Sequence, residues 1–297
     1  MDKFYKPSGK VPGSSALIVV AAAAAGSVLA PLYAACSLYV PVIYANMVLV
    51  CLYGWLTGKG AGLAVRASAT LNPRAAGLLA LPGALAGFAL SWAAWMGLFL
   101  KFGHADFPGA GEIAAYLSRP GGWAALLAEP WRFLDSLKEI YETGLWTVSF
   151  RNSSGSELKG GHLLVVWILE LAIYLAFAAG ASAKAARVPY SQEAGAFLRE
   201  ERRLPRAVAL PEEPGYYVQV LGAICSGDLA YISTAPQTEP GAFGFYVTLH
   251  SHENSPWGTA DVTRIAMRGK KKETMVLAAD VILPVSAMET LRERLSA

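Results

Sequence analysis

Glu170 is the residue whose type and position most clearly suggest chemistry in this chain. It is the only acidic residue in the apolar run from His162 to Ala183, and it lies about eight residues into that run, about 12 Å along a helix axis. A charge at the centre of a bilayer costs at least about 2.5–3.5 kcal/mol, so such residues usually serve a function. The expected roles are a proton or cation relay, or a polar contact with a partner helix. A hydrogen-bonded structural carboxyl is the alternative.

The groups available to Glu170 are neutral, because the other three apolar stretches contain no basic residue. Asn46, Ser91 or a tyrosine is therefore the expected hydrogen-bond partner. In the third stretch, Gly83 and Gly87 form a GxxxG pair, which permits close approach of two helix backbones. We expect this pair to pack within one chain, with a contact between copies in a homo-oligomer as the alternative.

Other candidate groups for metal or cofactor binding are weaker. His250 and His252 alternate along an expected strand and would face the same way, which supplies two metal ligands but no evident third or fourth. His104 with Asp106 is no stronger. The GKGAG run at 58–62 lacks the GxxxxGK[ST] spacing of a nucleotide-binding loop. With no Ser/His/Asp order, paired carboxylate site or CxxC motif evident, the sequence predicts no metal, no cofactor and no enzyme.

The apolar runs that surround these residues predict an α-helical membrane protein. The 297 residues are 54% hydrophobic and only 16% charged, whereas an ordinary soluble domain has about 25% charged residues. No Asp, Glu, Lys, Arg or His occurs between Gly13 and Gly58, or between Ala75 and Leu100. Because about 20 helical residues cross the hydrocarbon of a bilayer, the runs predict four transmembrane helices. Their expected ranges are about 14–35, 38–57, 77–100 and 163–183, within a transmembrane region 14–183.

The charges between the runs predict the orientation. The arm 1–13, the connection 58–76 and the segment 184–206 carry a basic excess, whereas the loop 101–161 has six basic and seven acidic residues. Basic loops stay in the cytoplasm, so four spans with both termini cytoplasmic satisfy every loop, and we expect a bacterial inner (cytoplasmic) membrane. The aromatic loop is expected to form short helices against the outer headgroups, followed by a strand–turn–strand unit.

The sequence after the fourth run predicts a juxtamembrane helix and a small cytosolic α+β domain. Residues 184–206 are expected to continue as a helix whose basic face contacts anionic lipid. The residues expected to make this contact are Arg199, Arg202, Arg203 and Arg206. Residues 207–297 predict strands in FGFYVTLHSHE, ADVTRIAMRG and ETMVLAADVIL, and a final helix with a capping box at Ser286 and Glu289. Residues 216–227 fit either a helix or a strand.

The charge balance of this tail limits its partners. From Lys184 to the end, the chain has thirteen basic and thirteen acidic residues, which argues against a nucleic-acid partner. The basic run 268–272 is expected to be a solvated hairpin tip, with membrane-surface contact as the alternative. The three cysteines do not form a disulfide framework.

The passage GLWTVSFRNSSGSELKGGHLLVVWILELAIYLAFAAG, followed by VPYSQEAGAF, resembles a group of uncharacterised bacterial multi-pass inner-membrane proteins with a cytoplasmic tail. In that group, a Gly-x-Trp turn and a last span containing Trp and Glu precede the tail. The resemblance implies that four residues here belong to one structural unit. These residues are Trp146, Gly161, Trp167 and Glu170.

Members of that group also carry paired cysteines after the last span and again in the tail. This chain has Ser191 and Ala194 at the positions of the first pair. It has Ser251 and Asn254 near the positions of the second pair. The structural metal site that the resemblance implies for the group is therefore expected to be missing here.

These features predict an integral-membrane scaffold or accessory protein that presents its cytosolic domain to a partner protein or a membrane complex. The alternative is a subunit of an oligomeric transporter or channel, in which Glu170 lines a polar path. The expected partners are the lipid bilayer and either another protein or further copies of this chain.

Overall fold

The computed structural model forms two compact units. It describes residues 4–39, 43–102, 109–144, 146–148, 156–201, 207–209, 218–219, 222–224, 237–238, 244–268 and 271–296. One unit comprises Gly9–Ala186, and the other combines Met1–Ser8 with Arg187–Ala297. Each unit is described by itself below.

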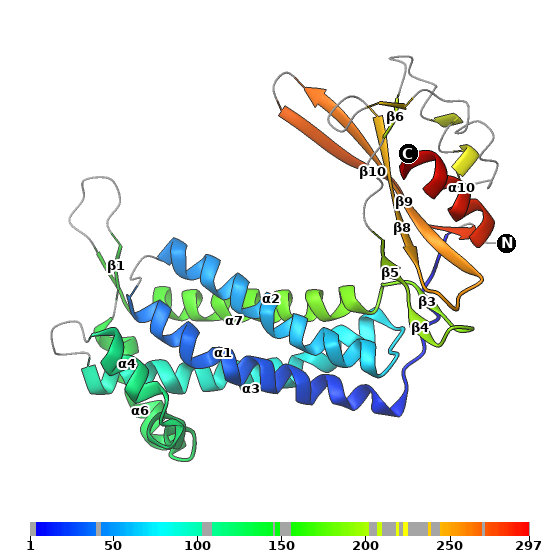
Figure 1. The fold of residues 1–297 in the computed structure, drawn as a ribbon. Coiled ribbons are helices and arrows are strands. Elements are labelled where there is room, and N and C mark those ends of the chain that lie inside the picture. The colour runs from blue at the N-terminus through cyan, green and yellow to red at the C-terminus, as the bar shows by residue number, and fades with distance from the viewer. Residues whose placement is uncertain are drawn as a thin grey trace. The chain divides into compact units, whose positions relative to one another are not determined.

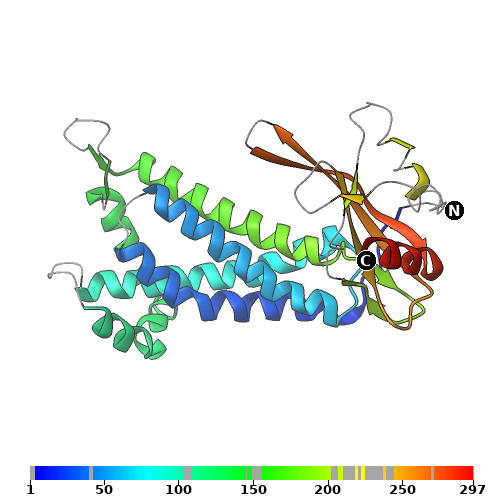
Figure 2. The same ribbon diagram turned by 45° about the horizontal axis from the view of Figure 1, so that its top comes forward.

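Four long helices form the first unit. They are α1 (Leu17–Tyr39, preceded by the 3-10 turn η1, Gly13–Ala16), α2 (Ile43–Ala67), α3 (Pro73–Phe102) and α7 (Gly161–Ala185). They run alongside one another in both views (Figures 1 and 2). Each contains a segment long and apolar enough to cross a membrane, which confirms the four predicted apolar helices.

The outer surface of this unit is apolar, while its interior is filled largely by alanine and glycine. Large apolar side chains are exposed on all four helices. Examples are Val28 (78% exposed), Leu63 (71%), Leu78 (66%) and Ile168 (57%). Extensive exposed apolar surface marks contact with a membrane or another protein rather than with water alone.

Glycines let α2 pack closely against α7. Gly54, Gly58 and Gly62 are spaced four residues apart, so they lie on one face of α2. A Cβ atom built on Gly58 would lie 2.3 Å from the carbonyl oxygen of Ala178, and one on Gly54 would lie 2.4 Å from that of Tyr174. No larger side chain fits between the two backbones at these points.

The prediction that residues 58–76 form a polar connection is wrong for most of its length. α2 continues as a helix to Ala67, so the connection shrinks to residues 68–72. Within the extended part, a Cβ on Gly60 would lie 2.4 Å from the Cβ of Ala25 on α1. Glycine suggests a loop in an aqueous segment, but in a helix packed on two sides it permits backbone contact.

The predicted GxxxG pair packs against α1 of the same chain. A Cβ on Gly83 would lie 2.2 Å from the carbonyl oxygen of Val19. A Cβ on Gly87 would lie 2.7 Å from the Cα atom of Gly26. The backbones of α1 and α3 are therefore in direct contact where they cross.

A layer of short elements connects α3 to α7. It contains α4 (Ala110–Leu117), α5 (Pro120–Trp123), η2 (Ala124–Leu127), α6 (Pro130–Thr143) and an antiparallel pair of strands, β1 (Trp146–Val148) and β2 (Ser156–Leu158). The short helices and the two paired strands were predicted and are confirmed, whereas the predicted turn between the strands lies outside the described residues. The helices gather at one end of the long helices (Figure 2). Their buried side chains, which include Trp123 and Leu126, pack against α3.

The second unit is built on an antiparallel sheet. Its long strands β8 (Gly244–Ser251), β9 (Trp257–Arg268) and β10 (Lys271–Pro284) pair in sequence, which confirms the three predicted strands. The short strands β6 (Ala207–Ala209) and β7 (Gln237–Thr238) complete the order β10-β9-β8-β6-β7. In the basic run 268–272, Arg268 pairs with Lys271 at the hairpin end of β9 and β10.

Helix α10 (Val285–Ser296) confirms the predicted final helix, although it begins one residue before the predicted cap at Ser286. It buries Met288 and Leu291 completely or nearly so. Of the ambiguous stretch 216–227, the described residues 218–219 and 222–224 are helical.

The first described residues of the chain belong to this sheet unit. Phe4 bridges Val281 on the edge of β10, and the N–H of Tyr5 donates to the carbonyl oxygen of Asp280 (2.9 Å). The Tyr5 ring stacks on Trp257 with 6.2 Å between centroids. The two ends of the chain therefore fold together, which the sequence alone did not predict.

The prediction of a juxtamembrane helix over 184–206 is wrong for its described residues. α7 ends at Ala185, and the chain then forms a hairpin of β3 (Tyr190–Ser191) and β4 (Ala196–Phe197). The next strand, β5 (Arg199–Glu200), pairs with β8 and so belongs to the sheet.

Local sequence opposes that helix at two points. Pro189 lacks the amide hydrogen that a helix interior needs, and Gly195 adopts a φ of +62° that other residues rarely adopt. Of the arginines expected on a lipid-facing helix, Arg199 is exposed on β5. The other three, Arg202, Arg203 and Arg206, lie outside the described residues.

An ion pair joins the segment after β5 to α10. Arg292 donates from Nε to Oε2 of Glu201 (2.8 Å) and from its Nη2 atom to Oε1, and the hydroxyl of Ser251 also donates to Oε1. The N–H of Glu201 donates to the carbonyl oxygen of Leu249 (2.8 Å). The hydrogen bonds from Arg292 are the main reason that the pKa of the Glu201 carboxyl lies below its ordinary value. One carboxylate thus connects β5, β8 and α10.

We expect Gly58→Ala to destabilise the helical unit by about 1–3 kcal/mol, because the added methyl group overpacks the α2–α7 contact. The thermal midpoint of the detergent-solubilised chain should fall. Gly180→Ala is the matched control, since a Cβ at Gly180 on α7 meets nothing within 4 Å. Equal midpoints for the two variants would contradict the close packing.

We expect Arg292→Ala to weaken the sheet unit by about 1 kcal/mol at pH 7, since the pair is partly exposed and charge-assisted hydrogen bonds are screened there. The lowered pKa of Glu201 stabilises the fold above the ordinary glutamate pKa of about 4.3, and this contribution is lost as the pH falls through the lowered pKa. The difference between wild type and variant should therefore shrink in acid. Amide hydrogen exchange of β8 and α10, corrected for intrinsic rates, measures this stability difference. Arg199→Ala, at an exposed position, is the control and should leave the exchange unchanged.

Candidate functional site

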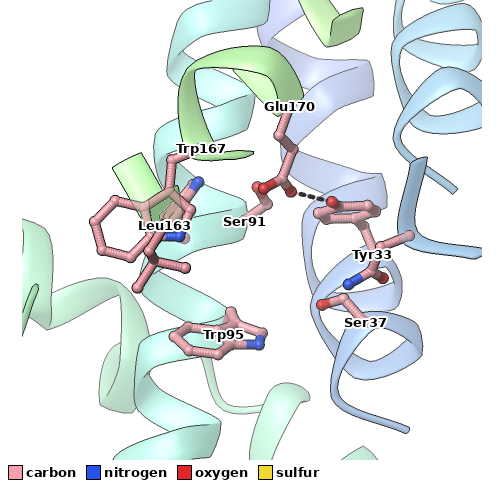
Figure 3. A pocket seen from close by; sticks show the side chains of 9 residues that line it. Tyr33, Ser37, Ser91, Trp95, Leu163, Trp167 and Glu170 are labelled. Atoms are coloured by element: carbon pink, nitrogen blue, oxygen red, sulfur yellow. Dashed lines mark hydrogen bonds between the residues drawn. The ribbon is translucent and has the colours of Figure 1, made fainter. Parts of the chain in front are cut away.

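The carboxyl group of Glu170 is held by a tyrosine from another helix. Glu170 lies on α7, and the hydroxyl of Tyr33 on α1 donates a hydrogen bond to its Oε1 atom. Figure 3 shows the two side chains pointing toward each other, with Ser91 of α3 beside the carboxylate. Of the partners expected from the sequence, a tyrosine is thus the one that makes the hydrogen bond.

Ring contacts with other tyrosines hold the side chain of Tyr33 in position. Its ring stacks on Tyr53 of α2 with 4.8 Å between centroids, and Tyr53 contacts Tyr174 of α7 at 4.5 Å. The Tyr53 hydroxyl lies 2.9 Å from the carbonyl oxygen of Gly26 and 2.8 Å from that of Gly87, so its proton serves one of them at a time. Each of the four long helices therefore contributes to the position of Tyr33.

Glu170 faces a small cavity that is lined by both polar and apolar side chains. Its polar lining comes from α1, α2, α3 and α7, as Tyr33, Ser37, Asn46, Ser91 and Glu170. The cavity volume is about 30 Å³, which is room for about two water molecules. Asn46 and Ser91, both expected near Glu170, are thus brought to the same cavity.

The protons of the cavity's hydroxyl groups are already committed elsewhere. Ser37 Oγ donates to the carbonyl oxygen of Ala34 (3.0 Å), and Ser91 Oγ donates to that of Phe88 (2.8 Å). Asn46 is only 4% exposed, and its Oδ1 atom has no hydrogen-bond partner. The cavity therefore presents several oxygen acceptors.

Three tryptophans contribute to the apolar part of the lining. Trp92 and Trp95 of α3 and Trp167 of α7 line the cavity, with Trp92 and Trp167 edge to face at 5.1 Å between centroids. Trp92 and Trp167 also line a separate apolar groove of about 290 Å³, next to Phe133 of α6. The aromatic side chains separate the polar cavity from this groove.

Three cavity residues that the sequence analysis did not name, Tyr33, Ser37 and Leu163, lie at helical spacings from other residues of the cavity. Tyr33 and Ser37 are four residues apart, and Leu163, Trp167 and Glu170 follow at steps of four and three. Such spacings place side chains on one face of a helix. The spacing alone is a usable signal once Glu170 is taken as the centre, but it does not say which helix faces which.

Of the four residues that the resemblance assigns to one unit, Trp167 and Glu170 line the cavity together. Gly161 is the first residue of α7, and Trp146 begins β1. The structure therefore brings two of these residues to the same site.

The two histidines expected on one strand do not form a pair. His250 lies on β8, but the strand ends at Ser251, and His252 accepts a hydrogen bond at Nδ1 from the N–H of Asn254 (3.3 Å). Within the described ranges, no group of three or more His, Cys, Asp or Glu side chains gathers as a metal site. His104 and Asp106 lie outside those ranges.

At the positions that correspond to the paired cysteines of the resembling group, Ser191 and Ser251 make ordinary hydrogen bonds. Ser191 is fully buried at the end of β3, and its Oγ atom accepts a hydrogen bond from the N–H of Ala194 (3.2 Å). It also donates to Glu193 (3.1 Å). Ser251 donates to Glu201 in the cluster described above.

The sheet unit presents a second candidate surface at the outer edge of β10. All four side chains from Glu273 to Val276 are exposed, among them Met275 (62%) and Val276 (59%). No other described strand pairs with the outer edge of β10, where Phe4 bridges Val281 and the N–H of Tyr5 donates to the carbonyl oxygen of Asp280. An exposed strand edge is a template for pairing with another strand.

Comparisons with protein-family models, with curated proteins and with solved structures give no match. The function is therefore inferred from these two sites.

Proposed function

We propose that this chain is a multi-pass bacterial inner-membrane scaffold that presents its sheet unit to a partner protein in the cytoplasm. The observation that carries the proposal is the exposed outer edge of β10, on a folded unit joined to apolar helices. A strand of the partner would extend the sheet by backbone hydrogen bonds, while the exposed apolar side chains add contact area.

Two observations support the membrane topology. Residues 4–8 and the carboxyl-terminal unit fold together, so both lie on the same side of any bilayer that the helices cross. An even number of crossings follows, in agreement with four apolar helices. The basic residues Lys59, Arg66 and Lys184 near the corresponding helix ends favour the cytoplasm for that side.

A photoreactive amino acid in place of Met275 tests the scaffold in native membranes. We expect a cross-link from the full-length chain to one discrete protein, because the exposed strand edge is the docking surface. The same amino acid in place of exposed Glu289 on α10 controls for random collision. Equal labelling at both positions, or adducts with lipid alone, would contradict the proposal. A cross-link to a second copy would identify a homo-oligomer instead.

A second candidate function is a subunit of an oligomeric transporter or channel. It is favoured by the polar cavity, in which Glu170 lies beside space for about two water molecules. A cavity of this size in a bundle of four helices does not form a path across a membrane, so several copies are required. Intramembrane carboxyl groups facing such cavities often mark ion pathways.

Reconstituted vesicles test this second function. We expect proton or cation flux through the wild-type chain and at least a tenfold loss in Glu170→Gln, which removes the charge but keeps an acceptor for Tyr33. Exposed Glu139→Gln on α6 is the matched control. Flux that is unchanged by Glu170→Gln would exclude Glu170 from the path.

A further inference from the structure

We propose that the cavity around Glu170 is a binding site for one small monovalent alkali cation. The inference deepens the second candidate function, because it names the ligand of the cavity, and it is independent of the scaffold role. Four observations carry it: the acceptor-rich lining, the unpartnered amide oxygen of Asn46, the single acidic side chain among the described lining residues and the size of the space.

The direction of each hydroxyl proton makes the cavity rich in acceptors. Ser37 and Ser91 give their protons to the carbonyl groups of their own helices, and Tyr33 gives its proton to Glu170. The oxygen lone pairs of these groups are left to face a ligand. Carboxylate, amide and hydroxyl oxygens are the ligands that hard cations prefer.

Asn46 provides an independent indication of a ligand. Its side chain is more than nine-tenths buried, it lines the cavity, and its Oδ1 atom has no hydrogen-bond partner. A buried acceptor without a partner is costly, so such atoms normally contact an ordered water molecule or an ion. A cation bound between Asn46 and Glu170 would satisfy this oxygen and balance the carboxylate.

The charge of the lining selects a monovalent ion. Among the described residues that line the cavity, Glu170 is the one acidic side chain, and none of them is Lys, Arg or His. The site therefore offers one negative charge, that of the ionised Glu170 carboxylate. A monovalent cation therefore produces a neutral site, whereas a divalent cation leaves a net positive charge among buried apolar side chains. Uncompensated charge is costly in such surroundings.

The cavity volume sets the size of the ligand. About 30 Å³ holds about two water molecules, which is enough for an alkali ion with one water molecule. Figure 3 shows Trp95 and Trp167 on the side of the cavity away from Tyr33. A volume of about 30 Å³ is too small for a quaternary ammonium ion as large as choline. Choline is therefore a suitable inert cation for comparison.

The test uses the purified full-length chain in detergent, with choline chloride replaced stepwise by sodium or potassium chloride at constant ionic strength. We expect one of the two alkali ions to raise the thermal midpoint in a saturable manner. The half-saturating concentration should rise at least tenfold in Glu170→Gln and in Asn46→Ala. Tyr33→Phe should also raise the half-saturating concentration. Tyr44→Phe is its control, because Tyr44 is 70% exposed and its substitution should leave that concentration unchanged.

Radioactive sodium or rubidium binding, counted per chain, gives a second measurement that does not depend on stability. One ion per wild-type chain is expected, and none above background in Glu170→Gln. No saturable binding of either alkali ion, a midpoint that responds only to pH, or a response only to ammonium would each overturn the proposal. Binding without flux in vesicles would retain this site and reject the second candidate function, and neither result depends on cross-linking at Met275.

Discussion

Direct backbone contact between α1 and α3 at Gly26 and Gly87 is the constraint on which the rest of the helical unit depends. With no side chain at either position, the carbonyl groups of both glycines lie within reach of one hydroxyl group, that of Tyr53. A Cβ atom at either glycine would meet the backbone of the other and the hydroxyl of Tyr174. The position of Tyr53 fixes Tyr33 by stacking, and Tyr33 in turn holds the carboxyl group of Glu170. A contact between two backbones thus determines where an acidic side chain lies on a third helix.

The sequence was sufficient to predict the four apolar helices because a run of about 20 apolar residues with almost no charge is typical of a membrane span. It failed at residues 58–67, where glycine and Lys59 suggested a loop. The missed signal was the repeat of Gly54, Gly58 and Gly62 at steps of four, which only a helical interpretation makes visible. Glycine favours turns in an aqueous loop but permits close backbone packing in a helix interface, and the local sequence does not distinguish these two roles.

In the sheet unit, alternation and β-branched content were enough to predict β8, β9 and β10. The segment 184–206 was misjudged because its basic and helix-favouring residues describe only the local preference. Pairing of β5 with β8, and of Phe4 with β10, joins segments that lie far apart in the chain. Such long-range pairing overrides local preference, and a single sequence does not reveal it.

At the candidate site, too, the sequence predicts which residue types are present but not how they are arranged. An acidic residue in an apolar run is visible in the sequence, and its neutral partners could be narrowed to a few types. Which oxygen atoms remain as acceptors depends on where each proton goes, and that depends on helix geometry. Ser37 and Ser91 each bond to the carbonyl group three residues earlier, a bond that a helix offers to any serine. A carboxyl group that served packing alone would need only Tyr33. The additional unpartnered oxygen of Asn46, which lines the same small space, is the observation that goes beyond a buried hydrogen bond and supports the proposed cation site.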